Sequence, residues 1–149
     1  MHRIFGKKEN VDYVERKGAY LVPIKNRKVA VVRTLKGLFL LGGGSELGET
    51  DQETIARECR EEIGCTAFVD RRVCTAETYM KHPDIGYFHP IQTYYLGEIS
   101  EQKQAPKEND HQLEWIAYPE LKGKLFAEMQ NWALEECWNM FCRKKNEEK

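Results

Sequence analysis

Three glutamates at helical spacing are the residues whose types and positions are best suited to chemistry in this chain. Glu58, Glu61 and Glu62 occupy positions i, i+3 and i+4, so a helix would present all three carboxylates on one face within one turn. Like charges at this spacing destabilise a helix by roughly a few tenths of a kcal/mol per pair, unless a multivalent cation neutralises them. Oxygen ligands select Mg2+, Mn2+ or Ca2+ over zinc. The cluster therefore indicates a metal site, and the alternative is an ordinary solvated helix face.

Local signals predict a helix over residues 51–63. Thr50 and Glu53 have the spacing of a capping box, and Gly64 is suited to end the helix. An apolar stripe with a spacing of four residues runs along the segment and consists of Ile55, Cys59 and Ile63. This stripe points roughly 120° away from the mean direction of the three glutamates, at about 100° per residue. The helix can therefore bury one side and hold its acids toward a cleft.

A glycine-rich connection precedes this helix. Residues 39–41 have the apolar character of a buried strand end and run directly into Gly42, Gly43 and Gly44. Glycines let a chain turn sharply and approach a ligand closely, and a strand-to-helix connection of this kind often presents backbone amides to phosphate. The alternative is a plain tight turn. The acidic helix that follows favours the phosphate interpretation.

Together these residues form a pattern that resembles the Nudix box. Its fixed glycines, acids and arginine are all present at the family's spacing: Gly43, Glu49, Arg57, Glu58, Glu61, Glu62 and Gly64. Glu46 and Gly48 also fit the common opening of that box. Two departures are Cys59 and Cys65, which stand where the family usually has an aliphatic residue. Because cysteine behaves as a small buried hydrophobe, we expect looser packing and unchanged chemistry.

The resemblance implies a fold, an activity and a cofactor. The implied fold is an α/β/α sandwich with a mixed β-sheet, a catalytic helix at about residues 51–63 and a long C-terminal helix. The implied activity is Mg2+-dependent hydrolysis of a diphosphate bond in a nucleoside diphosphate linked to another moiety X, with Mn2+ as a substitute metal. Members that bind a nucleotide without hydrolysing it usually lack one or more box acids. Every acid is present here, so we favour an enzyme over a nucleotide-sensing regulator.

The resemblance also assigns roles to individual residues. The implied metal ligands are Glu58, Glu61, Glu62 and the backbone carbonyl of Gly43. Arg57 would complete the catalytic set by bracing these ligands together with Glu49, without touching the substrate.

Several acidic residues are candidates for the general base. Within the helix, Glu58 or Glu61 can accept the proton of a metal-bound water, provided that the geometry allows it. Outside the helix, the polar stretch before the last strand offers Glu108, which we favour, followed by Asp110 and Glu114. The alternative for this stretch is a solvated polar loop.

Two segments are candidates for substrate contacts. The glycine loop offers Gly43, Gly44 and Glu46. Residues 79–89 combine aromatic rings with histidine and lysine, which can stack a base and hold a phosphate. The candidates in that segment are Tyr79, His82 and Tyr87. The alternative is that the aromatic side chains pack where a loop re-enters a strand.

The composition of the chain is that of one globular domain, which we assign to residues 1–149. A formal net charge of -1 gives no electrostatic reason to expect nonspecific nucleic-acid binding. No apolar run is long enough for a membrane span, and the first residues lack the apolar core of a signal peptide. The five cysteines are odd in number and include no C-x-x-C pair, which predicts a reduced, cytoplasmic protein.

The rest of the chain has the pattern of strands around the motif helix, followed by a terminal helix. The expected strands are residues 19–24, 28–34, 38–41, 65–69, 73–79, 91–99 and 113–118. From Pro119 onward the apolar residues keep helical spacing, and the charged tail 143–149 is expected to fray. Leu134 and Trp138 widen the apolar surface of that helix. They indicate either a homodimer face or a helix buried on two sides.

Overall fold

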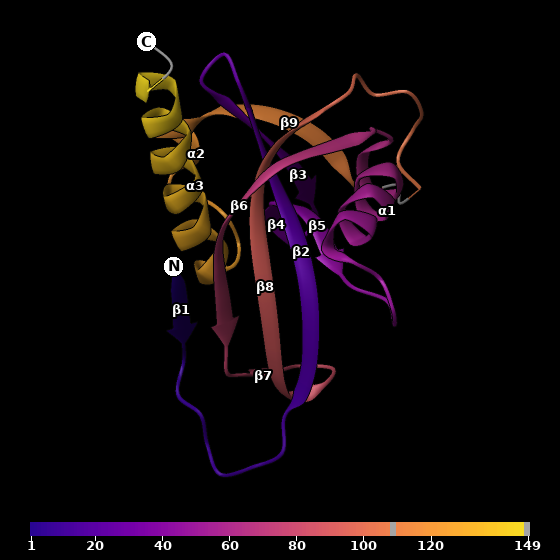
Figure 1. Ribbon diagram of the computed structural model, residues 1–149. Coiled ribbons are helices and arrows are strands. Elements are labelled where there is room, and N and C mark those ends of the chain that lie inside the picture. Colours follow the sequence, from indigo (N-terminus) through magenta and orange to yellow (C-terminus); the bar gives the residue numbers. More distant parts are fainter. Residues whose placement is uncertain (108–109, 148–149) are drawn as a thin grey trace.

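The computed structural model describes residues 1–107 and 110–147 and places a β-sheet between helices (Figure 1). In chain order the elements are β1 (His2–Phe5), β2 (Val14–Lys25), β3 (Lys28–Thr34), β4 (Gly37–Phe39), β5 (Leu41–Gly44), α1 (Asp51–Ile63), β6 (Ala67–Thr78), β7 (Met80–His82), β8 (Gly86–Ile99), β9 (Gln112–Ala117), α2 (Tyr118–Leu121) and α3 (Glu128–Glu147). The strand and helix order follows the sequence prediction, with the motif helix in the middle of the strands.

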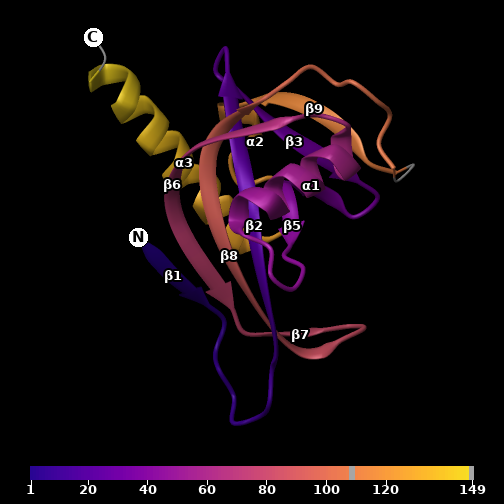
Figure 2. The same ribbon diagram turned by 45° about the vertical axis from the view of Figure 1, so that its right-hand side comes forward.

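Strand β2 organises the sheet because it has partners of both directions. It runs parallel to β8 from Val14 to Pro23 and antiparallel to β5 and β3. Beyond β8 lies β6, which is antiparallel to β8, and β1 then pairs with β6 in parallel. The hairpin of β7 and β8 projects from the end of the sheet (Figure 2). The sheet is therefore mixed, as predicted.

Side-chain alternation along β2 gives each face of the sheet its own core. Ala19 and Leu21 pack with Ile55 of α1 on one face. Val22 packs with Leu134 of α3 on the other face. The sheet thus lies between α1 and α3, which confirms the α/β/α sandwich.

Helix α1 begins and ends where the sequence predicts. The Thr50 hydroxyl accepts a hydrogen bond from the Glu53 backbone N–H at 3.2 Å, and the Glu53 carboxylate accepts one from the Thr50 N–H at 3.1 Å. Gly64 follows the last residue in the left-handed conformation, with φ of 66°. The predicted apolar stripe is buried, and it packs between α1 and the sheet. These local features fix the direction in which the acidic side of the helix points.

Several strands differ from the prediction, and most of the differences come from long-range pairing. The glycines at 42–44, expected in a connection, belong to strand β5, which pairs with β2. Strand β7 was not predicted. Strand β6 is continuous from Ala67 to Thr78, where two separate strands were expected. Irregularities in its register with β8, between Val69 and Arg71 and again between Arg72 and Cys74, shift the pattern that suggested a break. Strand β1 was not predicted. It pairs with residues 75–78, far along the chain.

Helix α3 extends beyond the expected end of regular structure. It continues to Glu147, so residues 143–147 are helical where the sequence suggested a frayed tail. Lys144 Nζ lies 2.5 Å from Asp70 Oδ2 of β6, and this ion pair ties the end of the helix to the sheet. None of the helices in the described ranges is long and apolar enough to cross a membrane.

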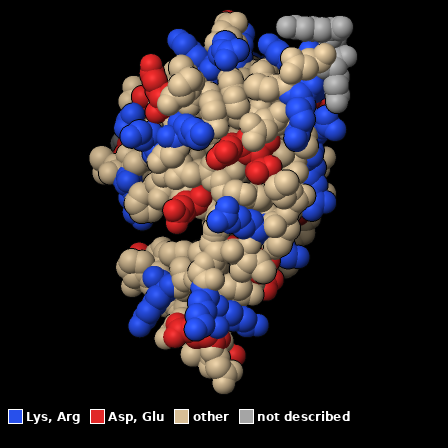
Figure 3. Space-filling view, turned by 90° about the vertical axis from the view of Figure 1, so that its left-hand side faces the viewer, with Lys and Arg blue, Asp and Glu red and all other residues tan. Residues whose placement is uncertain are grey.

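The wide apolar surface of α3 is used within the chain. Leu134 is buried in the core, and the Trp138 ring stacks on Tyr118 with the ring centres 4.3 Å apart. The outer face of the molecule that carries α3 mixes basic and acidic side chains (Figure 3). These contacts favour a helix buried on two sides, and homodimerisation stays a prediction.

The end of α1 should be sensitive to a side chain at Gly64. A Cβ there would lie 2.0 Å from the Gln104 carbonyl oxygen, whereas a Cβ at Gly123, with φ of 75°, would meet open space. The left-handed conformation costs a non-glycine residue roughly 1–2 kcal/mol. We therefore expect both Gly64→Ala and Gly123→Ala to lower the free energy of unfolding in urea, with the larger loss for Gly64→Ala. Equal losses would contradict the close contact.

Candidate active site

The glycine strand β5 and helix α1 bring backbone and carboxylates into direct contact. A Cβ added at Gly43 would lie 2.6 Å from the Glu58 carboxyl carbon, so the absence of a side chain makes room for that carboxylate. Glu62 Oε1 accepts a hydrogen bond from the Gly42 N–H at 3.0 Å. Two of the three predicted metal-binding acids therefore lie against the backbone of β5.

Arg57 fastens the glycine loop to α1. Its Nε and Nη2 donate to the two carboxylate oxygens of Glu49 at 2.8 and 2.9 Å, and Nη2 also donates to the Gly44 carbonyl oxygen at 2.9 Å. On the helix side, Nη1 donates to Glu58 Oε1 at 2.7 Å and lies 3.5 Å from Glu61 Oε2. One guanidinium thus joins the loop to two of the predicted acids. The arrangement supports a bracing role for Arg57 and Glu49.

Glu49 is held as an anion by this network. The hydrogen bonds from Arg57, followed by that from the Glu46 backbone N–H, lower the pKa of Glu49 to about 2. The Thr54 hydroxyl also donates to Glu49, at 3.0 Å. The same contact with Glu49 raises the pKa of Arg57. The Glu46 side chain itself is 69% exposed and lies 3.8 Å from Arg57, so this predicted substrate contact stands at the rim.

The box acids offer oxygen ligands, which hard divalent cations such as Mg2+ prefer. In the described part of the chain no three acidic, histidine or cysteine side chains form a group that could hold a metal ion as they stand. The donors are all carboxylate and carbonyl oxygens, and Mg2+ keeps several waters and needs only one or two carboxylates. Glu61 is 36% exposed, compared with 19% for Glu58, so its carboxylate can turn toward an ion without leaving a short hydrogen bond. We infer that these residues fit Mg2+ after a side-chain adjustment.

A pocket of about 450 Å3 opens beside Glu62 and Gly42. Its wall is formed by Tyr20, Val32, Thr34, Leu35, Lys36, Phe39, Leu40, Asp110 and His111. This volume and the mixture of aromatic and polar groups suit a small organic ligand. Burial, followed by the nearby Glu62 and Glu58 carboxylates, raises the pKa of Tyr20. Sequence reasoning missed Tyr20 as a site residue, and the pairing of Tyr20 with Gly42 across β2 and β5 explains its position.

The acids predicted outside the box have different surroundings. Arg33 binds both carboxylate oxygens of Glu114, so Glu114 is engaged across the β3–β9 pair. Asp110 lies in the wall of the pocket, next to His111. Glu108, the favoured candidate in the sequence, lies outside the described residues. Asp110 is therefore the predicted loop acid that the described structure places beside the pocket.

The predicted substrate contacts beyond the box, Tyr79, His82 and Tyr87, lie at the hairpin that contains β7 and β8. The Tyr79 ring stacks on His89 with the ring centres 4.1 Å apart. Tyr13 packs edge-on against the rings of both Tyr79 and Tyr87. None of the three lines the pocket beside the box acids. The contacts support the packing alternative for the two tyrosines, and a role in substrate binding stays a prediction.

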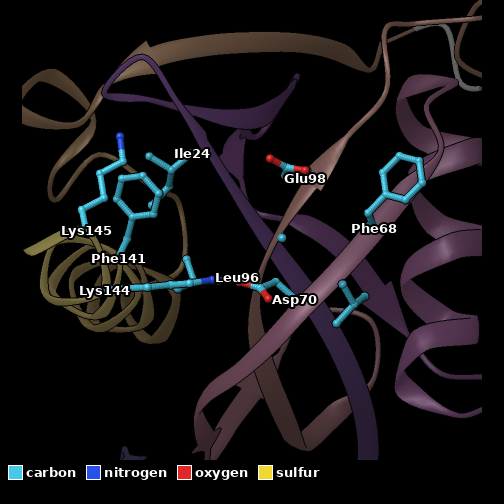
Figure 4. A pocket seen from close by; sticks show the side chains of 10 residues that line it. Ile24, Phe68, Asp70, Leu96, Glu98, Phe141, Lys144 and Lys145 are labelled. Carbon is cyan, nitrogen blue, oxygen red and sulfur yellow. Dashed lines mark hydrogen bonds and ion pairs between the residues drawn. The ribbon is translucent and has the colours of Figure 1, made fainter. Parts of the chain in front are cut away.

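A separate pocket of about 440 Å3 lies between α3 and the strands β6 and β8 (Figure 4). Phe141 and Lys145 line it from α3, and Asp70 and Glu98 line it from the strands. The ion pair of Lys144 with Asp70 lies in its wall. None of the residues that the sequence singles out for chemistry lines this pocket. We therefore assign the site to the pocket beside the box acids.

Ionised Glu49 should stabilise the fold in a pH-dependent way. Its pKa of about 2 in the folded protein lies below the unfolded value of roughly 4.3, so the stabilisation is complete above about pH 5 and is lost as the pH falls toward about 2. We expect Glu49→Gln to lower the melting temperature at neutral pH, with a difference from wild type that shrinks as the pH falls. Circular dichroism melts over this pH range measure it. Glu101→Gln, in an exposed loop, is the control, and a pH-independent difference for Glu49→Gln would refute the account.

The family comparison identifies the NUDIX domain over residues 15–135, from β2 into α3. A comparison with curated protein sequences found no match. Similar solved structures include the ORF135 protein of E. coli, with a TM-score of 0.67, 20% identity and coverage of 86% of this chain and 91% of that chain. The MutT NUDIX hydrolase of Burkholderia pseudomallei has a TM-score of 0.65 and 21% identity, with coverage of 83% and 98%. A NUDIX hydrolase from Nitrosomonas europaea has a TM-score of 0.69 and 15% identity, with coverage of 83% and 88%.

These structural similarities establish the fold, and the family match extends over most of the chain. The match includes the complete box, in which every acid, glycine and arginine of the pattern is present. The chain therefore belongs to the NUDIX domain family, as an enzyme of the Nudix pyrophosphohydrolase type.

Proposed function

We propose that this enzyme uses Mg2+ to hydrolyse a diphosphate bond in a nucleoside diphosphate linked to a moiety X. Water attacks phosphorus, and the products are a nucleoside monophosphate and X-phosphate, or the corresponding pair of phosphorylated fragments. The observation that carries the proposal is the Arg57 network, which holds Glu49 and Glu58 against the glycine strand. The names of the similar NUDIX hydrolases also support a hydrolytic reaction.

The metal ligands in this proposal are Glu58, Glu61, Glu62 and the backbone carbonyl of Gly43. When bound, Mg2+ supplies positive charge to the phosphate oxygens and a polarised water, and Mn2+ can substitute. Arg57 keeps Glu58 in place through the 2.7 Å hydrogen bond. Glu62 is oriented by the Gly42 N–H. The chain thus fixes two of the acids by contacts of its own.

Glu61 is the box acid that we favour as the proton acceptor. Glu58 already accepts a short hydrogen bond from Arg57, whereas the ion-pair contact of Glu61 with Arg57 is 3.5 Å long. The Glu61 side chain is also the more exposed of the two, so water reaches it more easily. A proton acceptor must come within hydrogen-bond reach of the attacking water. Glu108 stays the alternative from the later loop.

The remainder of the substrate would occupy the pocket beside Glu62. Tyr20 and Phe39 offer aromatic surface to a base, and Lys36 offers an ammonium group to a phosphate. Gly43 and Gly44 would allow the phosphates to approach the backbone.

A cytoplasmic location is supported by the cysteines. All five are unpaired, and four of them are buried, as expected of a protein in a reducing compartment. The reduced state and the location are therefore proposed together.

A hydrolysis screen with Mg2+ and then Mn2+ tests the enzyme. We would offer nucleoside triphosphates, including oxidised ones, ADP-ribose, NADH, dinucleoside polyphosphates and nucleotide sugars. One class should be cleaved at a diphosphate bond, and Glu61→Gln should lower kcat by roughly 10²–10⁴-fold because it removes a carboxylate that serves as metal ligand and proton acceptor in this proposal. Glu101→Gln is the matched control and should retain the wild-type rate. Tight nucleotide binding without cleavage would contradict the proposal and favour the regulator.

The proposed metal site can be tested by a binding measurement that does not depend on catalysis. Glu58→Gln removes a ligand, and Gly43→Ala places a Cβ against the Glu58 carboxylate while keeping every acid. We expect both variants to weaken Mn2+ binding by roughly tenfold or more, measured by electron paramagnetic resonance titration. Glu101→Gln should bind Mn2+ as the wild type does. Unchanged Mn2+ affinity in both variants would exclude this metal site.

A further inference from the structure

Strand β5 lies between the box acids and the side chain of Arg16. Successive side chains on a strand point to opposite faces, and the neighbours of two adjacent glycines show this directly. A Cβ at Gly43 would meet the Glu58 carboxylate, whereas a Cβ at Gly44 would lie 2.6 Å from Arg16 Nε and 2.9 Å from Arg16 Nη2. The Arg16 guanidinium therefore lies against β5 on the face opposite to Glu58.

The Arg16 side chain packs over a pair of glycines. Gly18 and Gly44 are directly paired across β2 and β5. A Cβ on Gly18 would come within 3.3 Å of Tyr20 Cε2, and residues 16, 18 and 20 share one face of β2 by alternation. Arg16 and Tyr20 thus lie over a pair of residues that have no side chains. A side chain at Gly44 would displace Arg16, whereas one at Gly18 would first meet the Gly43 carbonyl oxygen, at 2.8 Å.

The charge of Arg16 is not neutralised by an ion pair with a described residue. Arg57 binds Glu49 and Glu58, and Arg33 binds Glu114, but no salt bridge joins Arg16 to any carboxylate within residues 1–107 and 110–147. Arg16 is exposed to solvent. A guanidinium in this state is suited to bind a phosphate, with two parallel hydrogen bonds.

The pocket beside the box acids has wall residues that belong to both faces of the glycine strand. Its wall includes Glu62 of α1 and also Tyr20, which packs with the core on the α3 side. Gly42 lies between them in the same wall. Arg16 does not line this pocket. Its guanidinium lies against Gly44, two residues along β5 from Gly42 of the pocket wall, so a ligand that extends from the pocket along β5 would come close to Arg16.

We propose that Arg16 is a positioning residue that binds an anionic group of the substrate, a phosphoryl group outside the metal-bound pair, on the far side of β5 from the box acids. This inference rests on the proposed function and deepens it, because it requires a substrate whose negative charge extends past the glycine strand. Arg16 takes no part in bond breaking. Its contribution is to fix the position of the substrate relative to the box acids.

Inorganic triphosphate with Mg2+ is the probe, and isothermal titration calorimetry is the measurement. Arg16→Gln should weaken binding by about tenfold or more, because it removes a charge-assisted contact, and Arg16→Lys should restore part of the loss. Gly44→Ala should weaken binding to a similar extent by displacing the guanidinium, and it should add little when combined with Arg16→Gln. Lys25→Gln makes the same charge change at the other end of β2 and should have no effect.

Kinetics and stability separate positioning from a structural role. With the substrate found in the hydrolysis screen, Arg16→Gln should raise KM by about tenfold and change kcat little, while the melting temperature stays that of the wild type because the side chain is exposed. Wild-type triphosphate affinity in Arg16→Gln, or fully additive effects of the two substitutions, would overturn the inference.

The outcomes also distinguish the inference from the proposed function. If Glu58→Gln abolishes Mn2+ binding and hydrolysis while Arg16→Gln binds triphosphate normally, the anion site is wrong and the enzyme proposal stands. If triphosphate binding depends on Arg16 but no substrate is cleaved, the anion site stands and the hydrolytic proposal fails.

Discussion

The site depends on one guanidinium that is shared between a loop and a helix. Arg57 donates to Glu49 and to the Gly44 carbonyl on the loop side, and to Glu58 on the helix side. This cation lies between the Glu49 and Glu58 carboxylates and forms an ion pair with each of them. Because the same group satisfies a backbone carbonyl, it also fixes where the loop ends. A single side chain therefore links the charges of the acids to the geometry of the loop.

The glycine strand gives this arrangement its second constraint. A carboxylate lies against one side of β5 and a guanidinium against the other, and both approach because Gly43 and Gly44 have no side chains. The strand is held by β2, whose alternating side chains enter the cores under both α1 and α3. The position of the site is therefore tied to the central strand of the fold.

The features that the sequence predicts well are local. The capping residues, the stop at Gly64 and the apolar stripe all lie within residues 50–64, so they predict α1 to the residue. The resemblance to the Nudix box implies that Arg57 and Glu49 brace the acids, and the structure brings these two together. Features that depend on distant pairing escape this reasoning. Strand β1, the continuity of β6 and the engagement of Glu114 by Arg33 all follow from contacts between segments far apart in the chain.

The same distinction explains the substrate side of the site. Aromatic residues of the hairpin drew attention in the sequence, but Tyr79 packs on His89 in the fold. The pocket beside the box acids is lined by Tyr20, which the β2–β5 register places next to Gly42. A substrate role for the hairpin tyrosines stays a prediction.

The measurement that tests the central claim most directly is hydrolysis in 18O-labelled water, followed by 31P nuclear magnetic resonance of the products. Attack of water on phosphorus predicts the 18O isotope shift on one phosphate product, in the wild type and not in Glu61→Gln over the same time. Cleavage with no label on phosphorus would contradict the account.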